Sequence, residues 1–278
     1  MNKLSLIKVG GKVVENPETL AKLLNDFKQI SGYKILVHGG GKLATNLSQK
    51  MGIETQMVDG RRITDQATLE VVTMVYAGWC NKNIVALLQA EGCNAIGLTG
   101  ADGNAIKASR RPPVHVDSIG EDVDYGYVGD VTADSVNAGF IYSLLEKGIV
   151  PVFNAINHDG EGNLLNTNAD TIASSVAIAM AKYMYRSPRE VCSRCEEYET
   201  DLIYCFEKDG VLLDKNDDSS VIPEISQKSF EELKKNGIVA DGMIPKLTNS
   251  FKAIDSGVAR VVIKHARNLL NDKGTTLK

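Results

Sequence analysis

Short apolar runs alternate along the chain with segments in which apolar residues recur at helical spacing. The runs end in glycine or polar residues, as buried strands do, and they predict strands at 4–9, 33–37, 95–98, 149–153, 202–206 and 260–263. The periodic segments predict helices at 17–30, 43–51, 64–89, 136–146, 170–182, 230–235 and 245–256. Strands that alternate with helices predict an α/β fold, a three-layer αβα sandwich with a mainly parallel central sheet.

Two segments interrupt this alternation. Residues 110–131 contain Pro112-Pro113, alternating apolar residues and several acidic groups, which favours a β-hairpin or loop insertion over a helix. Residues 183–200 mix arginines with glutamates, which is typical of a solvated surface, and we expect an insertion between a helix and a strand there.

Composition and charge narrow the classes of function. The chain has 278 residues, 43% hydrophobic and 24% charged, as is ordinary for an enzyme with a sizeable core. Its net charge of −4 offers little support for binding nucleic acid, which needs clustered positive charge. We find no apolar run of the roughly 18–20 residues that span a bilayer and no signal-peptide pattern at the first residues. We therefore expect a cytoplasmic protein with neither a membrane nor a nucleic-acid partner.

The cysteines do not indicate a metal site. They are Cys80, Cys93, Cys192, Cys195 and Cys205. An odd number in a chain of this size favours reduced thiols. Cys192 and Cys195 form one C-x-x-C, but a structural zinc ion usually takes four ligands, and the histidines are scattered without ligand spacing. We expect no metal ion bound by side chains.

Three glycine clusters follow predicted strands. They are Gly10-Gly11, Gly39-Gly40-Gly41 and Gly97-Leu98-Thr99-Gly100-Ala101-Asp102-Gly103. Glycine lets a ligand approach the backbone closely, and its N–H groups can bind phosphate oxygens at the N-terminus of a helix. None of the clusters matches G-x-x-x-x-G-K-[ST] or G-x-G-x-x-G, so a dinucleotide-dependent dehydrogenase is disfavoured. Because glycine also makes ordinary turns, the clusters alone support only an anion site.

Two lysines occupy positions where a positive charge is costly without a nearby anion. Lys8 lies inside an otherwise apolar strand, where its ammonium loses hydration unless it meets an anion. The alternative is an edge strand from which the side chain reaches water. Lys246 follows Pro245 at the start of a predicted helix, where the helix dipole disfavours a cation. An ATP phosphate or Asp170 would supply the negative charge.

Polar side chains ahead of two predicted helices are candidates for binding a substrate. In Gly60-Arg61-Arg62-Ile63-Thr64, a guanidinium can hold a carboxylate through two hydrogen bonds. A surface position explains Arg61 more easily than Arg62. The segment Asn166-Thr167-Asn168-Ala169-Asp170 opens an Ala-rich helix, and capping explains one of its three polar groups but not all of them.

Taken in order, these motifs resemble the amino acid kinase family. The motifs are Lys8 with Gly10-Gly11, His38-Gly39-Gly40-Gly41, Gly60-Arg61-Arg62-Ile63-Thr64, Asn166-Thr167-Asn168-Ala169-Asp170 and Gly242-Met243-Ile244-Pro245-Lys246. The match runs from about residue 4 to residue 263, and within the family it is similar to the branch that phosphorylates N-acylated glutamate in arginine biosynthesis. It implies a single kinase domain over 1–278, with an acyl-amino-acid-binding lobe at about 1–165 and a nucleotide-binding lobe at about 166–278.

The resemblance implies a role for each matching residue. Catalysis would rest on two lysines that neutralise the phosphoryl group and on the aspartate that holds them: Lys8, Lys246 and Asp170. Phosphate would be bound by the backbone of the glycine loops: Gly10, Gly11, Gly40 and Gly41. The acylated substrate would be bound by Gly40, Gly41, Arg62, Asn166 and Asn168. The nucleotide would be contacted by Glu207, Gly210 and Met243. ATP would be the phosphoryl donor, with Mg²⁺ bound through its phosphates.

The chain departs from the family pattern in three places. It carries the insertion at 183–200, and it has Glu207 where the family usually has aspartate. It also begins almost directly at the first strand, without the helix associated with arginine-inhibited hexameric relatives. By resemblance we expect an arginine-insensitive homodimer.

The expected reaction is ATP-dependent phosphorylation of the γ-carboxylate of N-acetyl-L-glutamate, giving an acyl phosphate. A carboxylate is already ionised near neutral pH, so the reaction needs no general base. The same reaction on N-succinyl-L-glutamate is the alternative, which requires room and a cation for a second carboxylate. Further alternatives are a kinase for aspartate, glutamate, carbamate or a nucleoside monophosphate, and a non-catalytic metabolite-binding protein on the same fold.

Overall fold

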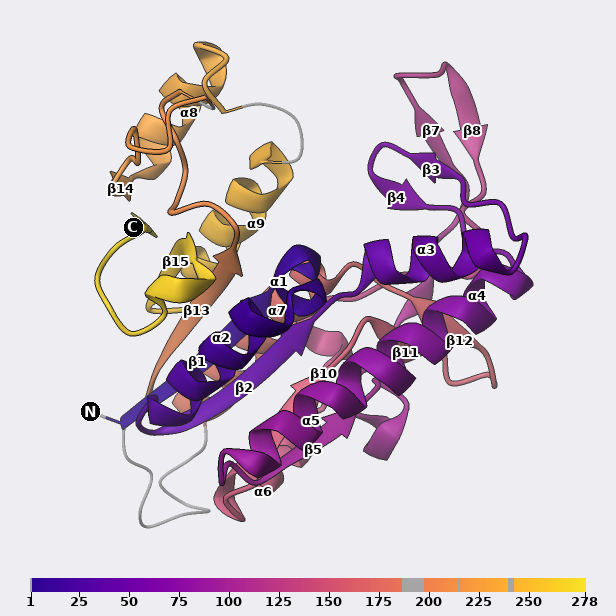
Figure 1. Ribbon diagram of the computed structural model, residues 1–278. Coiled ribbons are helices and arrows are strands. Elements are labelled where there is room, and N and C mark those ends of the chain that lie inside the picture. The colour runs from indigo at the N-terminus through magenta and orange to yellow at the C-terminus, as the bar shows by residue number, and fades with distance from the viewer. Residues whose placement is uncertain (1, 187–197, 215, 240–242) are drawn as a thin grey trace.

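The computed structural model describes residues 2–186, 198–214, 216–239 and 243–278 (Figure 1). Its centre is an eight-stranded sheet in the order β14-β16-β15-β13-β1-β2-β10-β5. The strands are β1 (Asn2–Val9), β2 (Tyr33–His38), β5 (Ala95–Leu98), β10 (Val150–Phe153), β13 (Tyr198–Phe206), β14 (Glu224–Ile225), β15 (Arg260–His265) and β16 (Thr275–Leu277). Neighbouring strands pair in parallel from β15 to β5, and β16 runs antiparallel to β15. The predicted mainly parallel sheet is confirmed.

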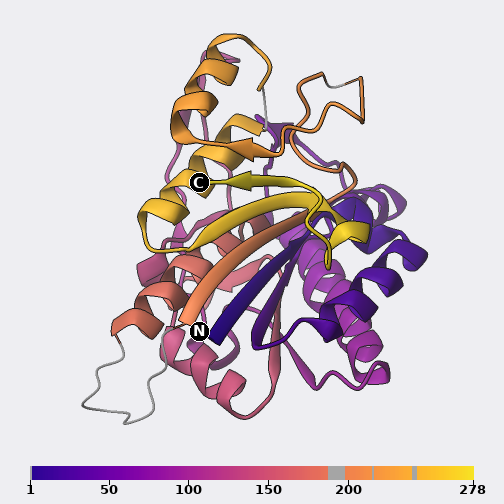
Figure 2. The same cartoon turned by 90° about the vertical axis from the view of Figure 1, so that its left-hand side faces the viewer.

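Helices cover both faces of this sheet. They are α1 (Gly11–Glu15), α2 (Pro17–Gln29), α3 (Gly41–Lys50), α4 (Gln66–Thr73), α5 (Asn81–Ala90), α6 (Ala138–Glu146), α7 (Ala169–Arg186), α8 (Gln227–Lys235) and α9 (Met243–Asp255), with shorter turns η2 (Asp102–Asn104), η3 (Ala133–Ser135) and η4 (Ala266–Asn268). α1, α2 and α5 pack together on one face, and α6, α7, α8 and α9 on the other. Figure 2 shows the strands fanning out between these two layers. The three-layer αβα sandwich is therefore confirmed.

Small antiparallel pairs extend beyond the sheet. They are β3 (Met57–Val58) with β4 (Arg61–Arg62), β6 (Ser109–Arg110) with β9 (Gly129–Asp130), β7 (Val114–Val116) with β8 (Glu121–Val123), and β11 (Ile156–His158) with β12 (Leu164–Asn166). The β3–β4 and β7–β8 hairpins lie together beyond the end of β2 (Figure 1), where Val58 packs on a small core that includes Val116 and Val123. The β-hairpin predicted within 110–131 is confirmed.

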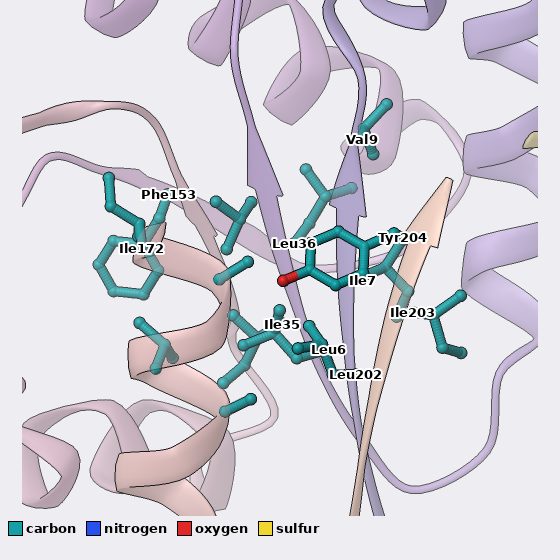
Figure 3. Packing of buried hydrophobic residues seen from close by; sticks show 14 of the residues in the cluster. Leu6, Ile7, Val9, Ile35, Leu36, Phe153, Ile172, Leu202, Ile203 and Tyr204 are labelled. Carbon is teal, nitrogen blue, oxygen red and sulfur yellow. The ribbon is translucent and has the colours of Figure 1, made fainter. Parts of the chain in front are cut away.

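The central strands are buried on both faces, which explains their continuous apolar runs. Leu6 pairs in register with Leu202 on one side and with Ile35 on the other, so the three side chains point to the same face. Figure 3 shows them on the side of the sheet that carries Ile172 of α7. The next position of the same kind on β1 is Lys8, which therefore also faces α7.

The helix predicted at 64–89 begins two residues later than expected and contains a π-helical segment. The Asp65 carboxylate accepts a 2.8 Å hydrogen bond from the Thr68 N–H and so starts α4 at Gln66. Between α4 and α5 the chain forms a π-helical segment, η1 (Met74–Cys80), so that Gln66–Ala90 is one continuous helix. This helix is long and apolar enough to cross a membrane by length and composition, contrary to the expectation that no run reaches that length. Packing of Leu69, Val72 and Ile84 into the main core accounts for much of its apolar character.

The segment expected to be an insertion is shorter than 183–200. α7 continues to Arg186, and β13 begins at Tyr198 because Tyr198 and Glu199 pair with Asn2 and Lys3 of β1. The remainder, 187–197, lies outside the described residues, as do Cys192 and Cys195.

Candidate active site

A small cavity lies at the carboxyl ends of β1 and β2, the edge of a parallel sheet at which ligands bind. Its volume is about 230 Å³. It is lined by Lys8, Gly39, Gly40, Gly41, Met57, Gly60, Arg61, Arg62, Tyr76, Val128, Ala155, Asn166, Thr167, Asn168, Ala169 and Asp170. The structure therefore brings together most of the residues predicted to bind phosphate and the acylated substrate.

One carboxylate joins the two predicted lysines. Lys8 Nζ lies 2.6 Å from Asp170 Oδ1, and Lys246 Nζ lies 3.4 Å from Asp170 Oδ2. β1 lies between β13 and β2, so the alternative of an edge-strand lysine that reaches water is wrong. Lys246 is the fourth residue of α9. The side chains of Lys8 and Lys246 are only 10% and 15% exposed, so both ammonium groups have lost most of their hydration.

The charges of this cluster depend on one another. Burial alone would raise the pKa of Asp170, but the ammonium groups of Lys8 and Lys246 hold it below its ordinary value. Burial lowers the pKa of Lys246, with a further lowering from Lys8, while Asp170 opposes the shift. Asp170 is thus an anion at neutral pH and a poor proton acceptor. The arrangement gathers positive charge for an anionic ligand.

The start of α7 fixes Asp170. Asn168 Oδ1 accepts hydrogen bonds from the N–H groups of Asp170 at 2.8 Å and Thr171 at 3.2 Å, so Asn168 caps the helix. Asn168 therefore caps α7, and it also lines the cavity.

Gly10 and Gly40 in the two glycine loops are closely packed, so a side chain there would require neighbouring atoms to move. A Cβ on Gly10 would lie 3.3 Å from both the Cys205 carbonyl oxygen and Phe206 Cδ1. A Cβ on Gly40 would lie 3.0 Å from Tyr76 Cδ1 and 3.1 Å from Cys80 Sγ. Gly11 and Gly41 are the first residues of α1 and α3, so both loops lead into helix N-termini. Such N-termini present free N–H groups to an anion.

The buried His38 supports the second glycine loop, Gly39-Gly40-Gly41. It is fully buried, and burial lowers its pKa to about 4, so the ring is neutral at pH 7. Asn81 Nδ2 lies 3.1 Å from His38 Nε2 and donates to the Val152 carbonyl oxygen at 2.9 Å. With Nε2 as acceptor, His38 Nδ1–H donates to the Gly39 carbonyl oxygen at 2.9 Å. A neutral ring with these contacts is a structural support rather than a general base.

Arg62 ties the β4 strand to α3. Its Nη2 donates to the Gly41 carbonyl oxygen and to Thr45 Oγ1, both at 2.9 Å, and its Nη1 donates to Thr55 Oγ1 at 3.3 Å. The side chain is buried, and within the described residues two of its five N–H donors make no hydrogen bond and could meet a ligand. Arg61, which we expected at the surface, lines the same cavity and is half-buried.

Thr64 lies in a predicted motif but was given no role of its own, and Tyr76 was not predicted at all. Thr64 is fully buried, and its Oγ1 accepts a 3.1 Å hydrogen bond from Asn166 Nδ2, which fixes the amide of Asn166. Tyr76 lies in the π-helical segment with its hydroxyl oxygen 3.8 Å from the place of a Cβ on Gly41. Burial raises the pKa of Tyr76, so it keeps its proton. π-helical turns often occur at functional sites, but nothing in the apolar periodicity separates Tyr76 from a core residue.

Gly10, Gly11 and Lys246 are not among the residues that line the cavity, and further predicted residues also lie outside it. The third glycine cluster begins within β5 at the edge of the sheet. A Cβ on Gly97, Gly100 or Gly103 would overlap Asn81, Asn157 or the ring of Phe140, so these glycines serve packing. Gly210 is similarly enclosed by Thr275 and Val221. Glu207 pairs with Lys12 at 2.7 Å, and Met243 begins α9. Gly242 of the last motif lies outside the described residues, as does the rest of 240–242.

A larger hollow of about 780 Å³ lies around Lys28, Tyr33, Lys34 and Tyr198. Because Tyr33 and Tyr198 are at the amino ends of their strands, this hollow is at the opposite edge of the sheet from the glycine loops. Lys34 Nζ donates to three backbone carbonyl groups there, so none of its three N–H donors is left for an anion. The smaller cavity is therefore the better candidate site.

Within the described residues, no group of three or more His, Cys, Asp or Glu side chains could hold a metal ion. Cys80, Cys93 and Cys205 are buried and unbridged.

Comparison with known proteins identifies the family. The family model described as "Amino acid kinase family" matches residues 3–183 and 197–265. Acetylglutamate kinase of Phocaeicola vulgatus is 55% identical over 276 residues, covering 99% of this chain and 98% of that protein. Acetylglutamate kinase of Methanopyrus kandleri is 40% identical over 275 residues, covering 99% of this chain and all of that protein.

Solved structures share the fold. The structure of smu.665 from Streptococcus mutans has a TM-score of 0.76 at 25% identity and covers 100% of this chain and 99% of its own. Carbamate kinase of Giardia has a TM-score of 0.66 at 13% identity and covers 99% of this chain and 98% of its own. With the site geometry, these matches show that the chain belongs to the amino acid kinase family.

Proposed function

We propose that this protein transfers the γ-phosphoryl group of ATP to the γ-carboxylate of N-acetyl-L-glutamate, giving an acyl phosphate in arginine biosynthesis. The observation that carries the proposal is the pair of buried ammonium groups on one carboxylate, beside the glycine loop 39–41, which Gly11 of the first loop approaches closely. The names of relatives at 50–55% identity over nearly the whole chain support the choice of substrate and favour N-acetyl over N-succinyl.

The chemistry follows from the charges. Phosphoryl transfer needs the reactants in line and the negative charge of the phosphates neutralised. Lys8 and Lys246 would stabilise that charge from two sides, and Asp170, which stays anionic, would hold both ammonium groups in place. The N–H groups of Gly11 and Gly41, at the starts of two helices, would bind oxygens of the transferred group, with Gly10 and Gly40 shaping the loops. The acceptor carboxylate attacks in its ionised form.

The acceptor would lie in the cavity between α3 and α7. Arg62 keeps two N–H donors for its carboxylate, and Asn166, held by Thr64, would bind the acyl amide. Asn168 would support both by capping α7. We assign the acyl-amino-acid side to about residues 1–165 and the nucleotide side to about residues 166–278, with Asn166 and Asn168 at the boundary reaching the acceptor.

The nucleotide would extend toward β13 and α9, where Glu207, Gly210 and Met243 would form part of its site. Mg²⁺ would be held by the phosphates of ATP rather than by a cage of side chains. The Glu207 carboxylate, 43% exposed and paired with Lys12, is free to exchange this partner for a ribose hydroxyl.

A homodimer in the cytoplasm completes the proposal. β5 is an edge strand with Ile96 36% exposed, and the helix Gln66–Ala90 exposes Met74 and Trp79, the latter to 69%. A large exposed aromatic side chain beside a free sheet edge suits an interface between two copies. Light scattering tests this: we expect the mass of two chains, and a shift toward one chain on Trp79→Glu.

Acceptor-dependent release of ADP tests the reaction. We expect release with N-acetyl-L-glutamate and much less with N-succinyl-L-glutamate, free glutamate, aspartate or carbamate. Absence of turnover with every acylated glutamate would refute the proposal, and comparable kcat/KM on free glutamate would reassign the substrate.

A further inference from the structure

Phe206, the last residue of β13, places its ring against both lysines of the site. The ring centroid lies 3.5 Å from Lys246 Nζ and 5.3 Å from Lys8 Nζ. Both distances are within the roughly 6 Å at which the face of an aromatic ring attracts a cation. Phe206 also stacks on Tyr204, with centroids 6.1 Å apart and planes 4° apart.

The first glycine loop holds this ring in position. A Cβ on Gly10 would approach Phe206 Cδ1 to 3.3 Å. The Gly10 N–H also donates a 2.9 Å hydrogen bond to the carbonyl oxygen of Cys205, the residue before Phe206. The phosphate loop, the ring and the two ammonium groups therefore form one contiguous cluster.

We infer that Phe206 is a positioning residue for phosphoryl transfer, whose ring holds the two ammonium groups together and charged without neutralising them. The inference rests on the proposed kinase function. Asp170 supplies one negative charge for two ammonium groups that repel each other. A second carboxylate would hold them too, but it would cancel the positive charge that the phosphates need. A ring attracts cations through its quadrupole and adds no net charge.

The ring of Phe206 should affect the charge of Lys246 more than any other property of the site. The groups that face Lys246 are Asp170 on α7, Lys8 on β1, Tyr204 on β13 and Glu207 directly after it. Burial lowers the pKa of Lys246 and Asp170 raises it. The ring favours the ammonium form, so weakening the ring lowers that pKa further and moves the alkaline limb of activity to lower pH.

The test replaces Phe206 with phenylalanines that carry one, two or three ring fluorines. These rings keep nearly the same shape while their negative face weakens. We expect kcat to fall at each step, by about 5- to 30-fold over the series, with little change in the KM for N-acetyl-L-glutamate. The same series at Phe230 is the control, because that ring is buried against Phe251 at 5.5 Å and no ammonium group of the described residues lies over it.

A second readout needs no substrate. In Phe206→Leu, with lysine labelled at Cε, NMR titration should show the pKa of Lys246 lowered by about half to one and a half pH units. Turnover by the unmodified protein is measured first, and its absence would refute the proposed function itself. In an active enzyme, a fluorine series with constant kcat or an unchanged Lys246 pKa in Phe206→Leu would overturn the role of Phe206 alone.

Discussion

The proposed acceptor side and the proposed nucleotide side of the site differ in how firmly their side chains are held. On the acceptor side, Arg62 is buried with three hydrogen bonds, and the amide of Asn166 is fixed by the buried Thr64. On the nucleotide side, Glu207 is 43% exposed and its partner Lys12 is 69% exposed. An exposed ion pair contributes little to stability and rearranges easily.

This difference indicates a division of work. The acceptor side is preorganised, which suits recognition of one small acylated amino acid. The nucleotide side can rearrange around ATP. Between them lies the cluster of Lys8, Asp170 and Lys246, to which we assign the chemistry. Substitutions should therefore have their largest effects in this cluster, intermediate effects on the acceptor side and small effects at Glu207.

Removal of the Lys8 charge should have the largest effect. Lys8→Met keeps the length of the side chain but leaves the phosphoryl group with one ammonium partner. We expect kcat to fall by about 10³- to 10⁵-fold, the range found for other cations that act on a transferred phosphoryl group. Steady-state kinetics measure this loss, and circular dichroism checks that the variant is folded. Lys12→Met, at an exposed lysine, is the matched control and should lose little. A folded Lys8→Met with normal kcat would remove Lys8 from the mechanism.

The buried His38, which supports the glycine loop on the acceptor side, should make the stability of the protein depend on pH. The pKa of His38 is about 4 in the folded protein and 6.5 when unperturbed, so between these values the unfolded chain binds the extra proton. Stability is therefore present above pH 6.5 and is lost as the pH falls toward 4, by about 3 kcal/mol. Urea unfolding at pH 7 and pH 4.5 measures this loss, and His38→Gln should reduce it. Equal losses in the two proteins would contradict a buried neutral ring.

The acceptor side itself is probed by Arg62→Lys. An ammonium group cannot reproduce the three hydrogen bonds of the guanidinium to Gly41, Thr45 and Thr55 while also meeting a ligand. We expect the KM for N-acetyl-L-glutamate to rise by about 10- to 100-fold. The KM for ATP, measured in the same assays, is the internal control. Equal rises in both constants would show that the two sides are not separate.

The smallest effect is expected at Glu207→Gln. The Lys12–Glu207 pair is exposed, so its loss should leave stability nearly unchanged. We expect the KM for ATP to change by about 2- to 5-fold, with the KM for the acceptor constant. If instead the KM for the acceptor changed more than the KM for ATP, Glu207 would not belong to the nucleotide side.

The fold was predictable where the sequence pattern is local. The strand expected at 95–98 coincides with β5, and the strand expected at 4–9 lies within β1. The helix at 64–89 was placed correctly but not its π-helical turn, because the apolar spacing of η1 resembles that of an α-helix. The length of β13 could not be predicted, because its first residues, Tyr198 and Glu199, are polar or charged and join the sheet only by pairing with β1.

Site residues could be predicted where a side chain would be energetically unfavourable unless it met a ligand or partner. Lys8 and Lys246 stood out because each is a cation in an unfavourable position, and the structure joins both to Asp170. Phe206 and Tyr76 could not be recognised in the same way, and Thr64 lay in a matching motif without a predicted role of its own. An aromatic residue or a threonine is ordinary in a buried segment, and its contact with the site depends on packing between distant elements.

The most direct test of the central claim is trapping of the product. Hydroxylamine converts an acyl phosphate to a hydroxamate, so incubation with ATP, Mg²⁺ and N-acetyl-L-glutamate should yield the γ-hydroxamate in amounts equal to the ADP released. The same incubation with Lys8→Met should yield almost none. ADP release without hydroxamate, or hydroxamate formed equally by Lys8→Met, would contradict phosphoryl transfer to the γ-carboxylate at this site.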